Sequence, residues 1–176
     1  MVFSLTPNAD GSWQEKVLHS FRGREGAYPN AGLMFDQAGD IYSTTVGVGS
    51  ACNGGCGVVF QLTPNSDGSW KDNTVHHFTG KDGWLPYAGL IFDVAGNIYG
   101  TTYLGGDFSN CRYGCGVVFR LKANSKGRWK EKVLHYFIEP PGAGPYGGLI
   151  FDAAGVLYGT TAGESGTLGS VFQISP

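Results

Sequence analysis

Four cysteines are the residues of this sequence with the most evident chemistry, and they come as two closely spaced pairs. Cys52 and Cys56 stand in Cys-Asn-Gly-Gly-Cys, and Cys111 and Cys115 stand in Cys-Arg-Tyr-Gly-Cys. Four cysteines can pair in three ways. Pairs at this spacing can also supply thiolates to a four-coordinate zinc ion. The spacing alone therefore leaves disulfides and a zinc site open.

Two recurring sets of side chains could hold a metal ion. They are His19, His76 and His135, and Asp36, Asp93 and Asp152. Imidazoles bind transition metals, and carboxylates around a channel could bind calcium. Each aspartate, however, opens an Asp-x-Ala-Gly sequence, where its side chain accepts hydrogen bonds from backbone N–H groups two residues on. We therefore interpret the aspartates as turn residues.

Carboxylates that do not recur could form the acid/base pair of a glycan hydrolase or lyase. Nothing in their spacing selects one pair. These residues are Glu25, Asp82, Asp107, Glu139 and Glu164.

The elements that position these residues are copies of one hairpin sequence. Gly89–Thr102 has near-copies at Gly32–Thr45 and Gly148–Thr161. Each copy has an apolar segment, an Asp-x-Ala-Gly turn and a Tyr-containing segment, which is the pattern of two strands joined by a tight turn. The repeat period is about 57 residues, which is in the range of propellers and other repeat arrays.

Two further strands complete each repeat, so that a unit has strand positions A and B (the hairpin), C and D. Position D carries the histidines. Counting every segment predicts thirteen strands and almost no helix. Position C is predicted to begin at Val2, Val59, Val118 and Val171, and position D to run over Trp13–Phe21, Trp70–Phe78 and Trp129–Phe137.

Four antiparallel strands per repeat and glycine-rich turns predict an all-β fold, a β-propeller of three four-stranded blades. A β-sandwich or β-prism is the alternative. We expect residues 1–176 to form one domain that starts and ends at position C. The blades cover about 32–78, 89–137, and 148–176 with 2–21. Position D is the outermost strand of a blade, so we expect the three histidines to be spread around the rim as packing residues.

The units Gly-Leu-Ile-Phe-Asp-Val-Ala-Gly-Asn-Ile-Tyr-Gly-Thr-Thr and Gly-Val-Val-Phe-Gln-Leu-Thr-Pro resemble the GloVer tandem repeat of bacterial extracellular and surface-anchored proteins. The hairpin is also similar to the inner strands of NHL-type propeller blades. The resemblance spans nearly the whole chain and implies export to the outside or surface of the cell. For an exported protein we expect the disulfides Cys52–Cys56 and Cys111–Cys115 rather than zinc.

Function is expected in the loops, where the three copies differ. In an up-and-down blade the D–A and B–C loops emerge on one face, and exposed aromatic rings there could stack on sugars. We expect this face to bind a glycan, and a purely structural or adhesive repeat is a further alternative. The expected ligand residues are Trp84, Tyr87, Tyr28, Tyr146, Tyr113, Arg24, Lys81, Asp82 and Asn110.

Composition excludes several other functions. The net charge is −2, and no run of Lys and Arg is present, which argues against nucleic-acid binding. No segment has 18 consecutive apolar residues, so no membrane insertion is expected. We expect no cofactor.

The thirteen predicted strands are one more than three blades need, because both ends of the chain carry a position-C strand. This affects how a propeller ring could close. Three blades would crowd a propeller axis, since propellers usually have four to eight. We expect two chains to close one six-bladed ring as a homodimer, with a closed monomer as the alternative.

Overall fold

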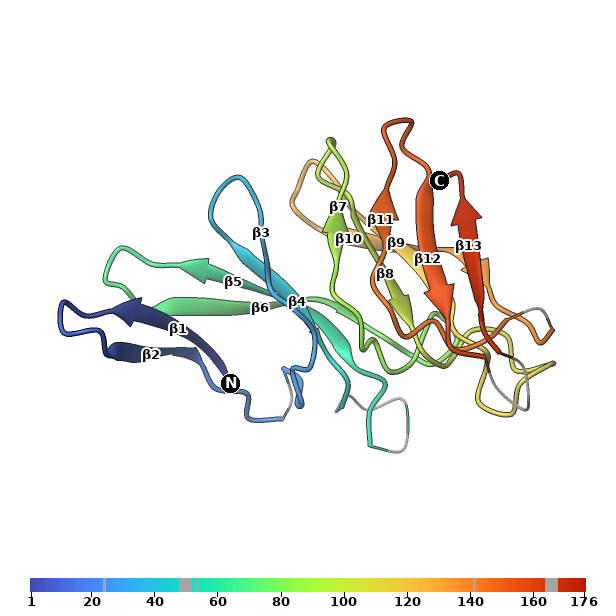
Figure 1. Ribbon diagram of the computed structural model, residues 1–176, viewed down its shortest axis with the longest axis horizontal. Coiled ribbons are helices and arrows are strands. Elements are labelled where there is room, and N and C mark those ends of the chain that lie inside the picture. Colours follow the sequence, from blue (N-terminus) through green and yellow to red (C-terminus); the bar gives the residue numbers. More distant parts are fainter. Residues whose placement is uncertain (24, 48–51, 53, 141, 164–167) are drawn as a thin grey trace.

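The computed structural model describes residues 1–23, 25–47, 52, 54–140, 142–163 and 168–176. These residues form thirteen β-strands in four antiparallel sheets (Figure 1). None of them belongs to a helix, so there is no helix that could cross a membrane. The all-β prediction and the strand count are confirmed. Arg24, one of the expected ligand residues, lies outside the described residues.

Two sheets contain all four strand positions, in the order A-B-C-D. The first consists of β3 (Met34–Phe35), β4 (Ile41–Thr45), β5 (Val58–Pro64) and β6 (Trp70–His77). The second consists of β7 (Ile91–Phe92), β8 (Ile98–Thr102), β9 (Val117–Ala123) and β10 (Trp129–Tyr136).

The two remaining sheets are incomplete and lie at opposite ends of the molecule (Figure 1). Positions C and D are present in β1 (Val2–Pro7) and β2 (Trp13–His19), and positions A to C in β11 (Ile150–Phe151), β12 (Leu157–Thr161) and β13 (Ser170–Ile174). The four sheets follow one another in chain order as an open row. The described part of one chain therefore does not close into a propeller.

Three hydrophobic clusters lie between successive sheets. The alternation of side chains along a strand divides its residues between two clusters. Phe119 of β9 packs toward the preceding sheet, with Tyr42 and Val59, whereas its neighbour Val118 packs toward the following sheet, with Leu157. This arrangement differs from a sandwich, which has one core between two sheets. The position-B strands of the two inner sheets, β4 and β8, are thus buried on both faces.

Hydroxyl groups also join successive sheets. Thr44 of β4 donates to the carbonyl oxygen of Pro86 at 2.7 Å, and Thr101 of β8 donates to that of Gly147 at 3.3 Å. Both threonines are buried, so these bonds satisfy polar groups that would otherwise be costly inside the core. These two threonines therefore belong to the core between sheets.

Three of the four position-C strands follow a glycine that the backbone conformation requires. Gly57, Gly116 and Gly169 have φ angles of +94°, +92° and +79°. A Cβ atom at Gly116 would collide with the backbone oxygen of Thr102, at the end of the neighbouring strand. Only glycine tolerates this φ without strain, which explains the repeated Gly-Val-Val-Phe sequence in β5 and β9.

The D–A and B–C loops lie together at one end of the sheets, as predicted. Ala27 bridges Gly47, and Trp84 bridges Leu104, so that each D–A loop runs antiparallel to the B–C loop of the same repeat. The short A–B and C–D turns form the other end. We call the first of these ends the long-loop face.

Candidate functional site

Local disulfides close both cysteine pairs. Cys52 is bonded to Cys56 and Cys111 to Cys115, with Cα–Cα distances of 5.2 and 5.4 Å. The expected pairing is confirmed, and these thiols are not available to zinc. Cys56 and Cys115 are fully buried and belong to two different hydrophobic clusters. Each disulfide therefore anchors a B–C loop to the core between sheets.

The repeated aspartates fix the A–B turns. Oδ1 of Asp93 accepts the N–H groups of Ala95 and Asn97 at 2.9 and 2.8 Å, and Asp36 and Asp152 make the corresponding bonds. Burial opposes ionisation of Asp93, but the hydrogen bonds from Asn97, Tyr99 and Ala95 outweigh it and hold its pKa below the ordinary value. No cluster of three or more possible metal ligands exists among the described residues. The turn interpretation is confirmed.

The repeated histidines pack against a phenylalanine two residues further on. The ring centroids of His19 and Phe21, His76 and Phe78, and His135 and Phe137 are 4.7, 4.9 and 4.8 Å apart, each pair edge to face. The three imidazoles belong to three different sheets and do not converge. Their expected packing role is confirmed.

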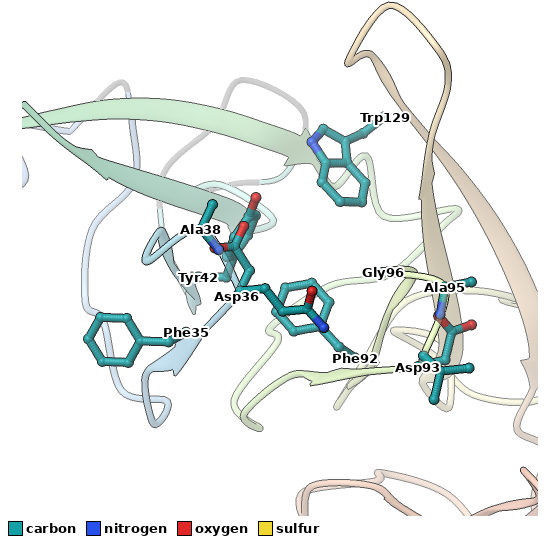
Figure 2. Close-up of a pocket in the computed structure, with 11 residues that line it drawn as sticks. Phe35, Asp36, Ala38, Tyr42, Phe92, Asp93, Ala95, Gly96 and Trp129 are labelled. Atoms are coloured by element: carbon teal, nitrogen blue, oxygen red, sulfur yellow. The ribbon is translucent and has the colours of Figure 1, made fainter.

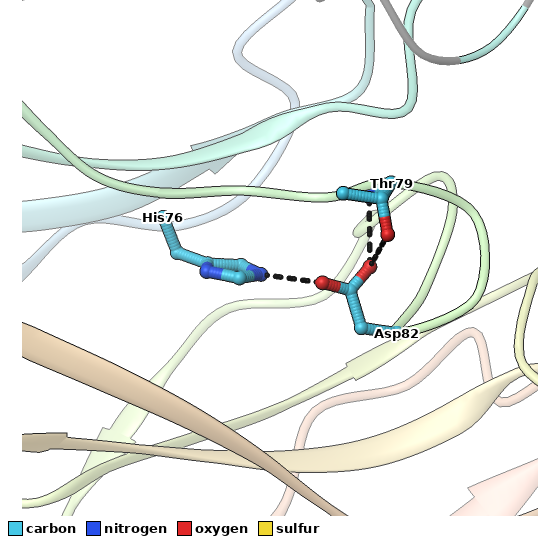
Figure 3. Close-up of polar contacts among 3 residues, drawn as sticks. All are labelled: His76, Thr79 and Asp82. Atoms are coloured by element: carbon cyan, nitrogen blue, oxygen red, sulfur yellow. Dashed lines mark hydrogen bonds and ion pairs between the residues drawn. The ribbon is translucent and has the colours of Figure 1, made fainter.

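His76 also contacts the D–A loop that follows β6, through Asp82 (Figure 3). Nε2 of His76 lies 3.1 Å from Oδ2 of Asp82, and Oδ1 of Asp82 accepts the N–H and the hydroxyl of Thr79 at 2.7 and 2.9 Å. Burial raises the pKa of Asp82, but the bonds from His76 and Thr79 outweigh it, so that its pKa lies below the ordinary value. Asp82, expected to contact ligand, is therefore engaged in holding the loop.

A hollow lies between the A–B turns of two neighbouring sheets, at the end opposite the long-loop face (Figure 2). It is a groove of about 540 Å³, with aromatic walls formed by Phe35, Tyr42, Phe92 and Trp129. The Tyr42 ring lies edge-on to Phe92 and to Trp129, at 5.3 and 6.1 Å. Burial, together with the charges of Asp36 and Asp40, raises the pKa of Tyr42.

Most of this groove is built from scaffold residues. The contact of Tyr42 with Phe92 recurs between Tyr99 and Phe151, at 5.2 Å. The carboxylate of Asp93 in its wall already accepts hydrogen bonds from its own turn. A feature that recurs between successive sheets is explained by packing and indicates no ligand.

Trp84 is half-buried, not exposed as expected. Its ring packs against the cluster that contains Cys56, and its indole N–H donates to the carbonyl oxygen of Gly55 at 3.2 Å. Tyr113 lies edge-on to it at 5.9 Å, with the Arg112 guanidinium 5.1 Å from the Tyr113 ring centroid. The D–A loop folds back on the disulfide-bonded loop of the preceding repeat, which draws the indole inward.

Three tyrosines gather at the inner part of the long-loop face. Tyr87 stacks on Tyr146 with centroids 4.8 Å apart and planes at 22°, and Tyr103 lies edge-on to both. Tyr146 is exposed, and Tyr87 and Tyr103 are half-buried. The structure therefore brings together two expected ligand residues from different repeats and adds Tyr103.

Tyr28 occupies another position. Its φ of 60° matches that of Leu85, at 57°, and Gly144, at 65°, and each of these residues precedes a proline. The residue equivalent to Tyr87 and Tyr146 in the first repeat is consequently Asn30. Tyr28 is exposed and lies against Gly47.

A second hollow, of about 490 Å³, lies on the long-loop face. Residues 106–109 of a B–C loop form one side of it, and Lys81 and Tyr136 complete the lining. Phe108 and Tyr136 both expose about half of their surface. Asn110, beside this hollow, is exposed, and its amide donates to the Ser109 hydroxyl at 3.2 Å. We call this place the loop hollow.

Two of the carboxylates considered for catalysis accept hydrogen bonds from their own loops. Glu25 accepts the N–H of Arg22 at 2.5 Å. Asp107 accepts the N–H of Ser109 at 2.9 Å, and this bond lowers its pKa. Glu139 is half-buried in the third D–A loop, and Glu164 lies outside the described residues. These contacts single out no catalytic pair among the described acids.

A sequence comparison agrees with the repeat pattern. Residues 1–176 match the family described as the Gloeobacter/Verrucomicrobia repeat. No curated protein matches the chain.

Proposed function

Because this chain belongs to the Gloeobacter/Verrucomicrobia repeat family, we propose that it is an extracellular carbohydrate-binding module whose long-loop face holds the ligand. Its fold is a segment of a β-propeller. Two buried local disulfides support the extracellular assignment, because disulfides persist in oxidising compartments.

The observation that carries the proposal is the loop hollow. Phe108 and Tyr136 present exposed rings at its edge, while Lys81 and Asp107 bring charged groups of both signs. A sugar offers the matching chemistry, since its C–H face packs on an aromatic ring and its hydroxyls bond to charged or polar groups. Neither ring recurs: positions equivalent to Tyr136 hold Ser20 and His77. Scaffold packing therefore does not account for them.

The tyrosine cluster extends the same face. Tyr146 is exposed beside the stacked ring of Tyr87, which gives a flat aromatic surface at a second place on the long-loop face. A polysaccharide has many repeated rings and could contact both places. The module would then bind several linked sugar units and not a single sugar.

Retention on insoluble polysaccharides tests the proposal. The protein is passed over chitin, cellulose, pectin and peptidoglycan, and both retention and released sugar are measured. We expect retention on at least one polymer without product release. Release of sugar would favour the hydrolase or lyase alternative, and no retention at all would favour a structural or adhesive repeat.

A pair of variants locates the site. Loss of a stacking aromatic commonly costs about 2 kcal/mol, so Tyr136→Ala should weaken binding roughly thirtyfold. Val94→Ala is the matched control, because Val94 is fully exposed on an A–B turn, away from the long-loop face. Equal effects of the two substitutions would show that the loop hollow is not the site.

A further inference from the structure

The contact between neighbouring sheets is built the same way each time. On the side that meets the preceding sheet, Phe60 and Leu62 of β5 are 2% and 0% exposed, and Phe119 and Leu121 of β9 are both 0% exposed. On the side that meets the following sheet, Val59 and Val118 are both 0% exposed. These residues define the two halves of one repeated interface.

The N-terminal sheet shows the first half of this interface to solvent. Phe3 and Leu5 of β1 are the equivalents of Phe60 and Leu62, and they are 46% and 51% exposed. Phe35, the equivalent of Phe92, is 62% exposed, because β1 and β2 lack the position-B tyrosine against which it would pack. An apolar face of this kind is normally covered.

The C-terminal sheet shows the second half. Ile150 of β11 is 67% exposed, whereas its equivalent Ile91 packs against the cluster shared with the following sheet. Tyr158 has no aromatic ring against it in the described chain, whereas Tyr42 and Tyr99 each meet a phenylalanine of the next sheet. The N-terminal sheet therefore lacks the position-B tyrosine, and the C-terminal sheet has this tyrosine, Tyr158, without its aromatic partner.

The charges of the two ends are also complementary. Arg120 lies opposite Lys132, and Lys122 opposite Lys130, on adjacent strands. Like charges placed directly opposite destabilise a sheet. The corresponding pairs of the preceding sheet are Gln61 with Asn73 and Thr63 with Lys71. None of the four cations forms an ion pair within the described residues.

These cations face the C-terminal end of the molecule, because Arg120 and Lys122 alternate with Phe119 and Leu121, which face the preceding sheet. Glu15 of β2 lies opposite Leu5 and thus on the exposed face of the N-terminal sheet. A carboxylate on one end therefore matches an unpaired basic patch at the other.

We propose that a second copy of this chain covers both ends. The sheet β1–β2 of one copy takes the place beside β12 of the other, so that positions A and B come from one chain and C and D from its partner. Phe35 then meets Tyr158 of the partner, and Glu15 faces the basic patch. β13, whose only hydrogen-bonded neighbour strand is β12, is displaced by β1, and Phe3 takes the place of its equivalent Phe172 beside Phe137. Two chains joined at both ends give six complete blades, within the usual range for propellers.

Sedimentation velocity of the full chain tests this. At micromolar concentration we expect a dimer with twice the 18.7 kDa mass of the chain. Phe3→Ser should raise the dimer dissociation constant roughly tenfold or more, as expected for a buried aromatic at an interface. Val94→Ser, on an exposed turn, should leave it unchanged. A stable monomer at tens of micromolar would overturn the proposal.

A charge swap shows which surfaces meet. Glu15→Lys and Lys132→Glu should each weaken the dimer, and the double variant should recover much of the loss because each interface then regains an opposite pair. Each variant is first shown to be folded by circular dichroism. A dimer insensitive to Phe3→Ser, or a double variant as weak as the sum of its single changes, would show that these ends do not meet as proposed.

Discussion

Glu131 provides a test of how closely neighbouring sheets pack. Its Oε1 atom is shut off from water and has no hydrogen-bond partner in the described structure. Burial raises its pKa to about 7, with the charge of Asp82 adding to the rise and that of His76 opposing it. Below a pH of about 4.5 the carboxyl is neutral in both the folded and the unfolded chain. Between about 4.5 and 7 it is ionised mainly in the unfolded chain, so stability is lost as the pH rises.

The size of this loss follows from the pKa. A change from 4.5 to about 7 corresponds to roughly 3 kcal/mol. Water reaches part of this half-buried side chain, which reduces the loss to roughly 1–2 kcal/mol. Glu131→Gln keeps the group neutral at every pH. We therefore expect the variant to be more stable than the parent at pH 8 by this amount and to show no such gain at pH 4.

Thermal and urea unfolding at pH 4, 6 and 8 measure the effect. For a chain of this length the expected rise in Tm at pH 8 is roughly 3–6 °C. Asp72→Asn is the matched control, since Asp72 is the equivalent residue of β6 and is exposed. A stability difference that does not change with pH, or an equal one in Asp72→Asn, would show that burial of the Glu131 carboxyl does not carry this cost.

Three further changes test individual contacts. Gly116→Ala should lower the free energy of unfolding by roughly 2 kcal/mol or more, because its φ and the backbone of Thr102 leave no room for a Cβ atom; unchanged urea unfolding would contradict this. Trp84→Ala should lower Tm by several degrees because the indole packs on the core. A variant with the Tm of the parent would show that the indole contributes no core packing. Joint replacement of Cys111 and Cys115 by serine should destabilise the fold, because both sulfurs are buried; an unaltered Tm would show that the disulfide only orders its loop.

Internal repetition made the strands predictable. Three copies of one hairpin identify positions A and B, and the Val-Phe and Trp segments identify C and D without reference to any other protein. The Asp-x-Ala-Gly turns and the two disulfides were equally predictable from the sequence, because their bonds join residues close in sequence.

Packing between segments distant in the sequence was harder to predict from the sequence. Trp84 stands in a loop, and its burial depends on Gly55, which lies 29 residues away. The basic patch is divided between two strands, with apolar residues alternating along β9, so no run of positive charges marks it in the sequence. It appears only once the register of β9 and β10 is known.

A proline in each D–A loop is a sequence signal that predicts which loop residues are equivalent. The proline after Tyr28, Leu85 and Gly144 aligns Tyr87 with Tyr146 and with Asn30. Aligning the loops on this proline pairs Tyr87 with Tyr146 and separates Tyr28 from them. The stacking of the two rings still required the structure, since it depends on how successive sheets sit against one another.

We propose that ligand binds where the repeats differ, on the long-loop face. Amide chemical-shift mapping by NMR during titration with a soluble oligosaccharide of the retained polymer tests it most directly. We expect the shifts to concentrate at Lys81, residues 106–109 and Tyr136. Shifts confined to the A–B turns at 36–40 and 93–97, where the aromatic groove lies, would contradict it.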